Sequence, residues 1–252
     1  MRRMLFALLL AIAASPAAAE RLVSTVSTPV VEITSSFDGV GLSLFGNILP
    51  DVDSPTGIAE GPYNIIIVVT GPLQDRVARM KTNTFGIWTN TDEFTFKLFP
   101  SYYAVIASGR LENIADETVL AEQSIHPEAQ AILAAGQDTL KARRFGRELV
   151  RLMTQEGHLT LNEDGVQFLS DTAYTARVNL PSDVVNGAFI AHTLVFKNKV
   201  LVAERSEGFS ARKSGVERFV FVTARQQPLF YGLACVILAL GTGWLAGVAF
   251  KR

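Results

Sequence analysis

Apolar residues form one long run near each end of the chain and short, partly alternating groups between them. The C-terminal run, residues 229–250, carries no charge. A helix rises about 1.5 Å per residue, so this run would extend about 33 Å, close to the hydrocarbon thickness of a bilayer. A buried helix of that length in a soluble protein would show a polar face, which this run lacks. The pattern therefore predicts a single transmembrane helix at 229–250.

The N-terminal run has the layout of a secretory signal. Two arginines precede apolar residues 4–14, and small residues follow at 17–19. About 11 apolar residues are too few to span a bilayer, and basic, apolar and small-residue regions in this order mark a cleavable signal. We expect residues 1–19 to be a signal peptide cleaved after Ala19. An uncleaved signal anchor is the alternative, and it would leave the following domain on the same face of the membrane.

Basic residues at the two flanks of the C-terminal run bear on its orientation. Lys251 and Arg252 follow the run directly and favour a cytoplasmic tail at 251–252, whereas Arg225 on the other flank is a counter-signal. Together with the signal peptide, this predicts a single-pass protein of the inner (plasma) membrane. Its N-terminal domain would be periplasmic and its C-terminus cytoplasmic.

Residues 20–110 show the pattern of a β-rich periplasmic region. Segment 63–70 is almost continuously apolar, as in a central strand that is covered on both faces. Other predicted strands lie within 21–48 and at 76–81, 94–99 and 101–108, with a polar turn at 89–93. Short strands with turn signals at roughly ten-residue spacing are typical of an immunoglobulin-like β-sandwich.

A helical segment, residues 111–157, interrupts the strands. Helices are predicted at 127–135 and 138–156, the second with Asp138 as its N-cap and Gly157 as its stop. The chain therefore belongs to a mainly β class with a helical insert and one C-terminal transmembrane helix.

Strand patterns return in a second β-rich region, residues 158–214. The polar turn at 197–199 lies between two extended runs and predicts a hairpin. The membrane-proximal segment 215–228 fits either a strand or a helix, and we favour a helix that leads into the span.

Composition limits the chemistry that the chain can perform. A net charge of −1 gives no reason to expect a nucleic-acid partner. The one cysteine, Cys235, lies within the predicted span, so the exported domain has no disulfide and no thiolate site. No nucleophile elbow, Walker A loop or dinucleotide-binding glycine motif occurs, and the three histidines lack metal-site spacing. We expect no catalytic residue, cofactor or metal, and hence no enzyme.

Three arginines on the second predicted helix form a candidate contact surface. Arg143, Arg147 and Arg151 stand four residues apart and therefore share one face. Such a stripe can dock anionic lipid headgroups or an acidic partner. The alternative is the ordinary solvated face of an amphipathic helix.

Two further features suggest contacts. Gly243 and Gly247 form a GxxxG motif within the predicted span, which allows close approach to a second copy or to another membrane protein. Trp88, with Tyr102 and Tyr103, could line a ligand groove, and aromatic core packing is the alternative.

Short motifs along almost the whole chain carry a family resemblance. They are Ser36-Phe37, Leu44-Phe45-Gly46, Gly71-Pro72, Gly86-Ile87-Trp88 with Asn90, Pro100-Ser101 with Tyr103, Gly215 with Glu217-Arg218, and Pro228-Leu229 with Tyr231-Gly232. With these motifs the chain resembles a family of uncharacterised alphaproteobacterial transmembrane proteins. The resemblance implies a signal peptide, one C-terminal span and an association with a permease similar to the sulfite/taurine exporters. It implies no catalytic residue.

Three functions fit these observations. The first is a non-enzymatic accessory protein, held at the inner membrane by one helix and in contact with a transporter. The second is a periplasmic ligand-binding or sensing domain with a pocket between the two β regions. The third, an enzyme of unrecognised type, has no support from any motif.

Overall fold

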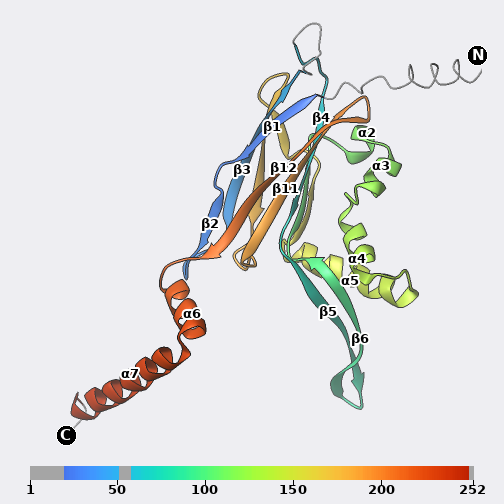
Figure 1. Ribbon diagram of the computed structural model, residues 1–252. Coiled ribbons are helices and arrows are strands. Elements are labelled where there is room, and N and C mark those ends of the chain that lie inside the picture. The colour runs from blue at the N-terminus through green and yellow to red at the C-terminus, as the bar shows by residue number, and fades with distance from the viewer. Residues whose placement is uncertain (1–19, 51–57, 250–252) are drawn as a thin grey trace, which may run out of the picture.

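The computed structural model describes residues 20–50 and 58–249. Two β-sheets pack face to face, and a group of helices covers the outer face of the larger sheet (Figure 1). The predicted signal peptide and the cytoplasmic tail lie outside the described residues, as does most of the loop at 51–57.

The smaller sheet has four antiparallel strands in the order β1-β3-β10-β9. They are β1 (Arg21–Val26), β3 (Val40–Leu49), β10 (Ala173–Leu180) and β9 (Val166–Phe168). The larger sheet has six strands in the order β2-β12-β11-β4-β7-β8, with parallel pairs only at its two edges. They are β2 (Val30–Ile33), β12 (Val200–Lys213), β11 (Gly187–Lys197), β4 (Asn64–Thr70), β7 (Tyr103–Ala107) and β8 (Leu159–Asn162).

The β4 strand is buried on both faces, as its continuous apolar sequence predicted. Ile65 and Ile67 contribute to the core between the two sheets. Ile66 and Val68, which alternate with them, contribute to a second core beneath the helices. Alternation of side chains across a strand explains why one sequence run serves two cores.

Strands from the two β-rich stretches of the sequence pair within the same sheets. The β10 strand is hydrogen-bonded to β3, and β11 to β4, although the helical segment separates them in the chain. The mainly β fold with a helical insert and a two-sheet sandwich is thus confirmed.

The helical segment contains α2 (Leu111–Ile114), α3 (Glu117–Glu122), α4 (Pro127–Ala135) and α5 (Leu140–Gln155). The prediction that Asp138 caps α5 is wrong, because the Thr139 hydroxyl accepts the hydrogen bond from the Ala142 amide at 3.1 Å. Asp138 instead pairs with Arg143. The helix ends before Gly157, whose φ of 77° suits glycine, as expected.

A long two-stranded hairpin, β5 (Leu73–Thr84) and β6 (Ile87–Pro100), projects beyond the sandwich (Figure 1). The predicted polar turn at 89–93 is wrong: these residues continue β6, and the turn lies at Phe85 and Gly86. A ribbon that is exposed on both faces needs no apolar alternation, so its polar sequence resembles a loop.

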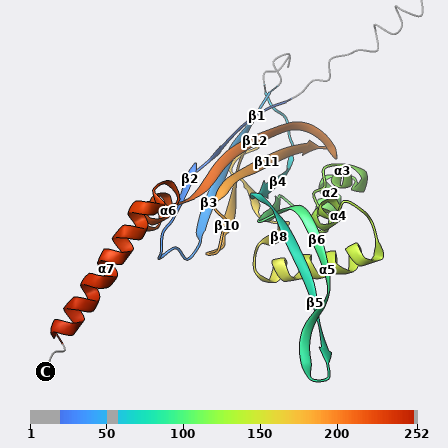
Figure 2. The same cartoon turned by 60° about the horizontal axis from the view of Figure 1, so that its bottom comes forward.

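Two helices follow the last strand. The α6 helix (Val216–Gln226) confirms the helical prediction for the membrane-proximal segment, and α7 (Pro228–Ala249) is the predicted span. No residue of α7 is buried, and it alone among the described helices is long and apolar enough to cross a membrane. In both views α7 and the β5–β6 hairpin leave the sandwich toward the same side (Figures 1 and 2).

Candidate functional site

A groove of about 900 Å³ lies between α4 and α5 on the outer surface of the helical layer. Its lining is mostly apolar. The apolar lining residues are Ala131, Ile132, Ala135, Leu140, Ala142, Gly146 and Val150, and charged side chains of Glu128, Asp138, Arg143, Arg147 and Arg151 lie around them. We call this the α4–α5 groove.

Close packing of the two helices forms the floor of the groove. The α5 helix buries Phe145 and Met153 against the second core, beside Gly146. A Cβ at Gly146 would lie 3.1 Å from the Cβ of Ala131, so the small residue permits the close approach of α4. Beside this contact, apolar side chains remain open to solvent: Ile132 is 56% exposed and Leu140 87%.

The predicted arginine stripe borders the α4–α5 groove, but its three members differ. Arg143 is paired with Asp138, and Arg151 donates to Glu148 at 2.9 Å and to Gln155 at 3.1 Å. Arg147 makes no ion pair or side-chain hydrogen bond within residues 20–50 and 58–249. The available positive charge is therefore concentrated at the middle of the stripe.

The Asp138–Arg143 pair has a clear electrostatic effect. The hydrogen bond from Arg143 lowers the pKa of the Asp138 carboxyl, and the same contact raises the pKa of Arg143. Both groups remain charged at neutral pH and largely compensate each other. A ligand that approaches this end of the groove therefore meets a neutral pair.

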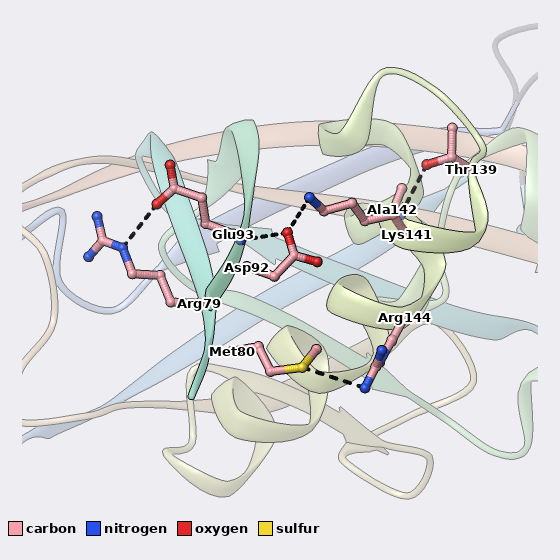
Figure 3. A network of polar contacts seen from close by, with 8 residues as sticks. All are labelled: Arg79, Met80, Asp92, Glu93, Thr139, Lys141, Ala142 and Arg144. Atoms are coloured by element: carbon pink, nitrogen blue, oxygen red, sulfur yellow. Dashed lines mark hydrogen bonds and ion pairs between the residues drawn. The ribbon is translucent and has the colours of Figure 1, made fainter. Parts of the chain in front are cut away.

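Polar contacts hold the α5 helix against the middle of the hairpin (Figure 3). Lys141 pairs with Asp92, the Arg144 guanidinium lies 3.5 Å from the Met80 sulfur, and Arg79 pairs across the strands with Glu93 at 3.2 Å. The hydrogen bond from Lys141 lowers the pKa of Asp92. We call these contacts the hairpin clamp.

Aromatic packing lies beside the hairpin clamp. Phe94 of β6 stacks on Phe145 of α5 with ring centroids 6.4 Å apart, and it also contacts Phe96. The middle of the hairpin and the α4–α5 groove therefore belong to one packed unit.

Trp88 lies apart from the α4–α5 groove, and its part in a ligand groove stays a prediction. Its side chain is 67% exposed near the end of the hairpin, and it is absent from the lining of the α4–α5 groove. Tyr102 and Tyr103 are buried in the two different cores, as the packing alternative proposed. Burial raises the pKa of Tyr102 to about 12.

Gly243 and Gly247 lie on the exposed surface of α7, where an added Cβ would meet no atom within 4 Å. A helix contact at this GxxxG motif stays a prediction.

Each histidine is close to a single carboxylate. His126 pairs with Glu117, His158 with Asp183 and His192 with Glu204. No group of three metal-ligating side chains occurs within residues 20–50 and 58–249. Their surroundings suit structural roles for these histidines.

The apolar half of the α4–α5 groove was not found from the sequence. Ile132 and Leu140 lie in the predicted helices 127–135 and 138–156, and nothing in their spacing shows that they remain exposed. The pair Ile132 and Leu133 gives no signal either, because adjacent apolar residues are common in the core-facing stripe of a helix.

Comparison with known proteins bears on the whole chain. Residues 21–252 match the sequence profile of a protein family described as "Putative transmembrane protein (Alph_Pro_TM)". The matched stretch begins after the predicted signal peptide and contains all of α7. No curated protein and no solved structure matches the chain.

Proposed function

We propose that the chain, which belongs to this alphaproteobacterial transmembrane family, is a non-catalytic accessory protein of the inner membrane. Its β-rich domain lies in the periplasm, α7 crosses the membrane once, and the C-terminus is cytoplasmic. The unburied α7 helix, with the family match, supports the anchor.

The observation that carries the accessory role is the α4–α5 groove. It combines exposed apolar side chains with one arginine, Arg147, that has no partner among the described residues. A protein segment with apolar side chains and one carboxylate complements such a surface, because the apolar groups leave water and the carboxylate pairs with the guanidinium. We propose that this segment belongs to an inner-membrane permease of the sulfite/taurine-exporter type.

The exposed face of α7 supports a second contact with the same partner. Gly243 and Gly247 would let a partner helix approach closely, because neither carries a side chain. Self-association of α7 would use the same face, so the two contacts are alternatives at this position.

Affinity capture tests the accessory role directly. The tagged full-length protein, expressed at its native level and extracted in mild detergent, should recover a polytopic transporter that mass spectrometry identifies. Recovery of the protein alone would contradict the proposal.

A reporter enzyme fused after Arg252 tests the orientation, because it should be active only in the cytoplasm. Release of the full-length protein from membranes by carbonate would contradict the anchor.

The size of the groove also favours the second candidate function, a ligand-binding domain. A volume of about 900 Å³ is in the range of small-molecule sites. Native mass spectrometry of the purified protein separates the two functions, since a bound small molecule would add a discrete mass that Ile132→Glu removes. A partner segment would add no such mass.

A further inference from the structure

The end of the β5–β6 hairpin carries three apolar side chains that are largely exposed. Phe85 is fully exposed, Ile87 is 66% exposed and Trp88 is 67% exposed. They are consecutive except for Gly86, and they form the outermost part of the ribbon (Figure 1). We call residues 85–88 the hairpin tip.

The turn itself is built at a conformational penalty. Thr84 pairs with Ile87, so Phe85 and Gly86 form a two-residue turn with φ values of 54° and 83°. Asn-Gly or Asp-Gly normally occupies such a turn, because a bulky residue at positive φ is strained. Phe85 therefore opposes the local backbone preference and gains no packing within the domain in return. An outlier of this kind points to a contact outside the domain.

Polarity changes in steps along the hairpin. Behind the hairpin tip, uncharged threonine and asparagine side chains fill both strands, and the first charged residues are Lys81 on β5 and Asp92 on β6. Lys81 precedes Phe85 by four residue steps, which corresponds to about 13 Å along a strand. The order apolar, uncharged polar, charged is the order of environments from the acyl chains to the water outside a bilayer.

Part of the backbone at the hairpin tip is satisfied internally, which favours contact with lipid. The Gly86 amide donates to the Asn83 side-chain oxygen at 2.8 Å, and cross-strand pairing continues up to Thr84 and Ile87. Few unpaired polar groups would have to leave water when the tip enters an apolar layer.

The middle of the hairpin is held by the helical layer, so the direction of the hairpin is a property of the fold. The hairpin clamp joins Lys141 to Asp92 and Arg144 to Met80 (Figure 3). The tip projects beyond these contacts (Figure 2). The tip points to the same side of the sandwich as α7 in both views (Figures 1 and 2). A membrane crossed by α7 thus lies on the side toward which the tip points.

We propose that the hairpin tip inserts into the outer interfacial layer of the membrane that α7 crosses, with Phe85, Ile87 and Trp88 at the boundary of the acyl chains. The occupant is lipid, not a protein. Aromatic side chains favour this layer, and together with α7 the tip would give the domain a second attachment and a fixed tilt. The inference uses the anchor of the proposed function and is independent of the α4–α5 groove.

Tryptophan fluorescence tests the proposal in the full-length chain, which has two tryptophans, Trp88 and Trp244. The variant Trp244→Phe leaves Trp88 as the sole reporter. It is reconstituted into phosphatidylcholine vesicles, with or without bromine on the acyl chain near the headgroup. If the tip reaches the interfacial layer, bromine should reduce Trp88 emission strongly, and aqueous iodide should quench it only weakly. Equal emission in both vesicles overturns the proposal, whether Trp88 is then open to iodide or covered by protein.

Two matched variants support the assignment. Phe85→Asn in the Trp244→Phe background should weaken bromine quenching of Trp88, and the fold is preserved because Asn suits positive φ. Leu169→Asn removes another exposed apolar side chain, in the turn between β9 and β10, and should leave the quenching unchanged. Equal quenching in both variants would contradict a specific role of the tip.

The variant Trp88→Phe separates failure of this proposal from failure of the anchor. It retains Trp244 in α7, which bromine near the middle of the acyl chains should quench. Quenched Trp244 with unquenched Trp88 rejects the tip and retains the anchor. Unquenched Trp244 rejects the anchor itself.

Discussion

The ring of Tyr174 in β10 lies directly over Gly46 in β3: a Cβ at position 46 would be 2.4 Å from the Tyr174 Cζ atom. The two residues are cross-strand partners. Tyr174 is 1% exposed, and burial is the main reason that its pKa is raised to about 12. The absent side chain at Gly46 therefore lets a large ring lie flat within the core between the sheets.

This relationship predicts that Gly46→Ala destabilises the domain. The new methyl group would overlap the Tyr174 ring, and relief by shifting the ring would disturb a closely packed core. We expect the free energy of unfolding to fall by about 2–3 kcal/mol, measured by chemical denaturation of the full-length protein in detergent. Gly109→Ala is the matched control, because no atom lies within 4 Å of its added Cβ.

A double-mutant cycle isolates the Gly46–Tyr174 contact. If the overlap causes the loss, Gly46→Ala should be far less harmful in a Tyr174→Ala background, where the ring is gone. Additive losses would show that the effect of Gly46→Ala arises elsewhere.

Several elements could be predicted from the sequence because local pattern alone determines them. The helix α5 buries one continuous stripe, so its periodicity is strong, and β4 is buried on both faces, so its sequence is continuously apolar. The span α7 follows from length and the absence of charge. In each case the signal lies within one segment of the chain.

The pairing of distant strands could not be predicted. The β3 strand pairs with β10 and β4 with β11, across all four helices of the insert, and no local pattern encodes that choice. The outer part of β6 was mistaken for a turn because Thr89–Glu93 are stabilised by cross-strand contacts, such as the 2.8 Å bond from Thr82 to Thr91, and not by burial.

Only part of the candidate site could be predicted, because local sequence determines its arginines whereas packing between separate segments determines its groove. The arginine spacing along α5 is local, whereas the apolar floor of the α4–α5 groove depends on how closely α4 approaches at Ala131 and Gly146. A sequence pattern records which residues are apolar, but the depth of a groove between two helices depends on their packing.

The tyrosine beneath the helices provides a second stability test. The Tyr103 hydroxyl donates within reach of two carbonyl oxygens, that of Ser124 at 2.9 Å and that of Ile125 at 3.2 Å. Tyr103→Phe should lower the free energy of unfolding by about 1–2 kcal/mol, because a buried acceptor loses its donor. In Tyr103→Phe the Ser124 carbonyl oxygen still accepts a hydrogen bond from the Gln130 side chain at 2.9 Å. The double variant with Gln130→Leu should therefore lose more free energy of unfolding than the two single variants added together. A loss near zero for Tyr103→Phe would show that these carbonyls find water.

The hairpin clamp predicts a specific dependence on pH. Lys141 is the main reason that the pKa of Asp92 is lowered, so Lys141→Met should raise that pKa toward the ordinary value of about 3.9. A carboxyl with a depressed pKa in the folded state stabilises the fold above the unfolded-state pKa, and this contribution disappears as the pH falls through the folded-state value. The clamp should therefore be intact at neutral pH and weaken in acid.

Carboxyl-carbon NMR shifts of Asp92, followed against pH, measure this effect. Lys81→Met is the matched control, since Lys81 is also on the hairpin but forms no ion pair within the described residues. If the pKa of Asp92 is equal in the wild type and in Lys141→Met, Lys141 does not pair with Asp92 in solution and the hairpin clamp is contradicted.

Two adjacent residues of α4 give the sharpest test of the α4–α5 groove. Ile132 lines the groove and is 56% exposed, whereas Leu133 is 60% exposed and lies outside it. Either residue can become Glu with similar small effects on stability, because both side chains are already largely in water. Only Ile132→Glu places a carboxylate in the groove, where it would pair with Arg147 or repel the acidic group of a partner.

We therefore expect Ile132→Glu to reduce recovery of the membrane partner about tenfold or more, as the loss of a central apolar contact in an interface commonly does. Leu133→Glu should leave recovery unchanged. The measurement is quantitative mass spectrometry after affinity capture, with each variant expressed at the native level. Arg147→Ala should give an intermediate loss, since it removes the charge but keeps the apolar floor. If both glutamate variants capture the partner equally, the contact surface lies elsewhere, and α7 with Gly243 and Gly247 becomes the next position to test.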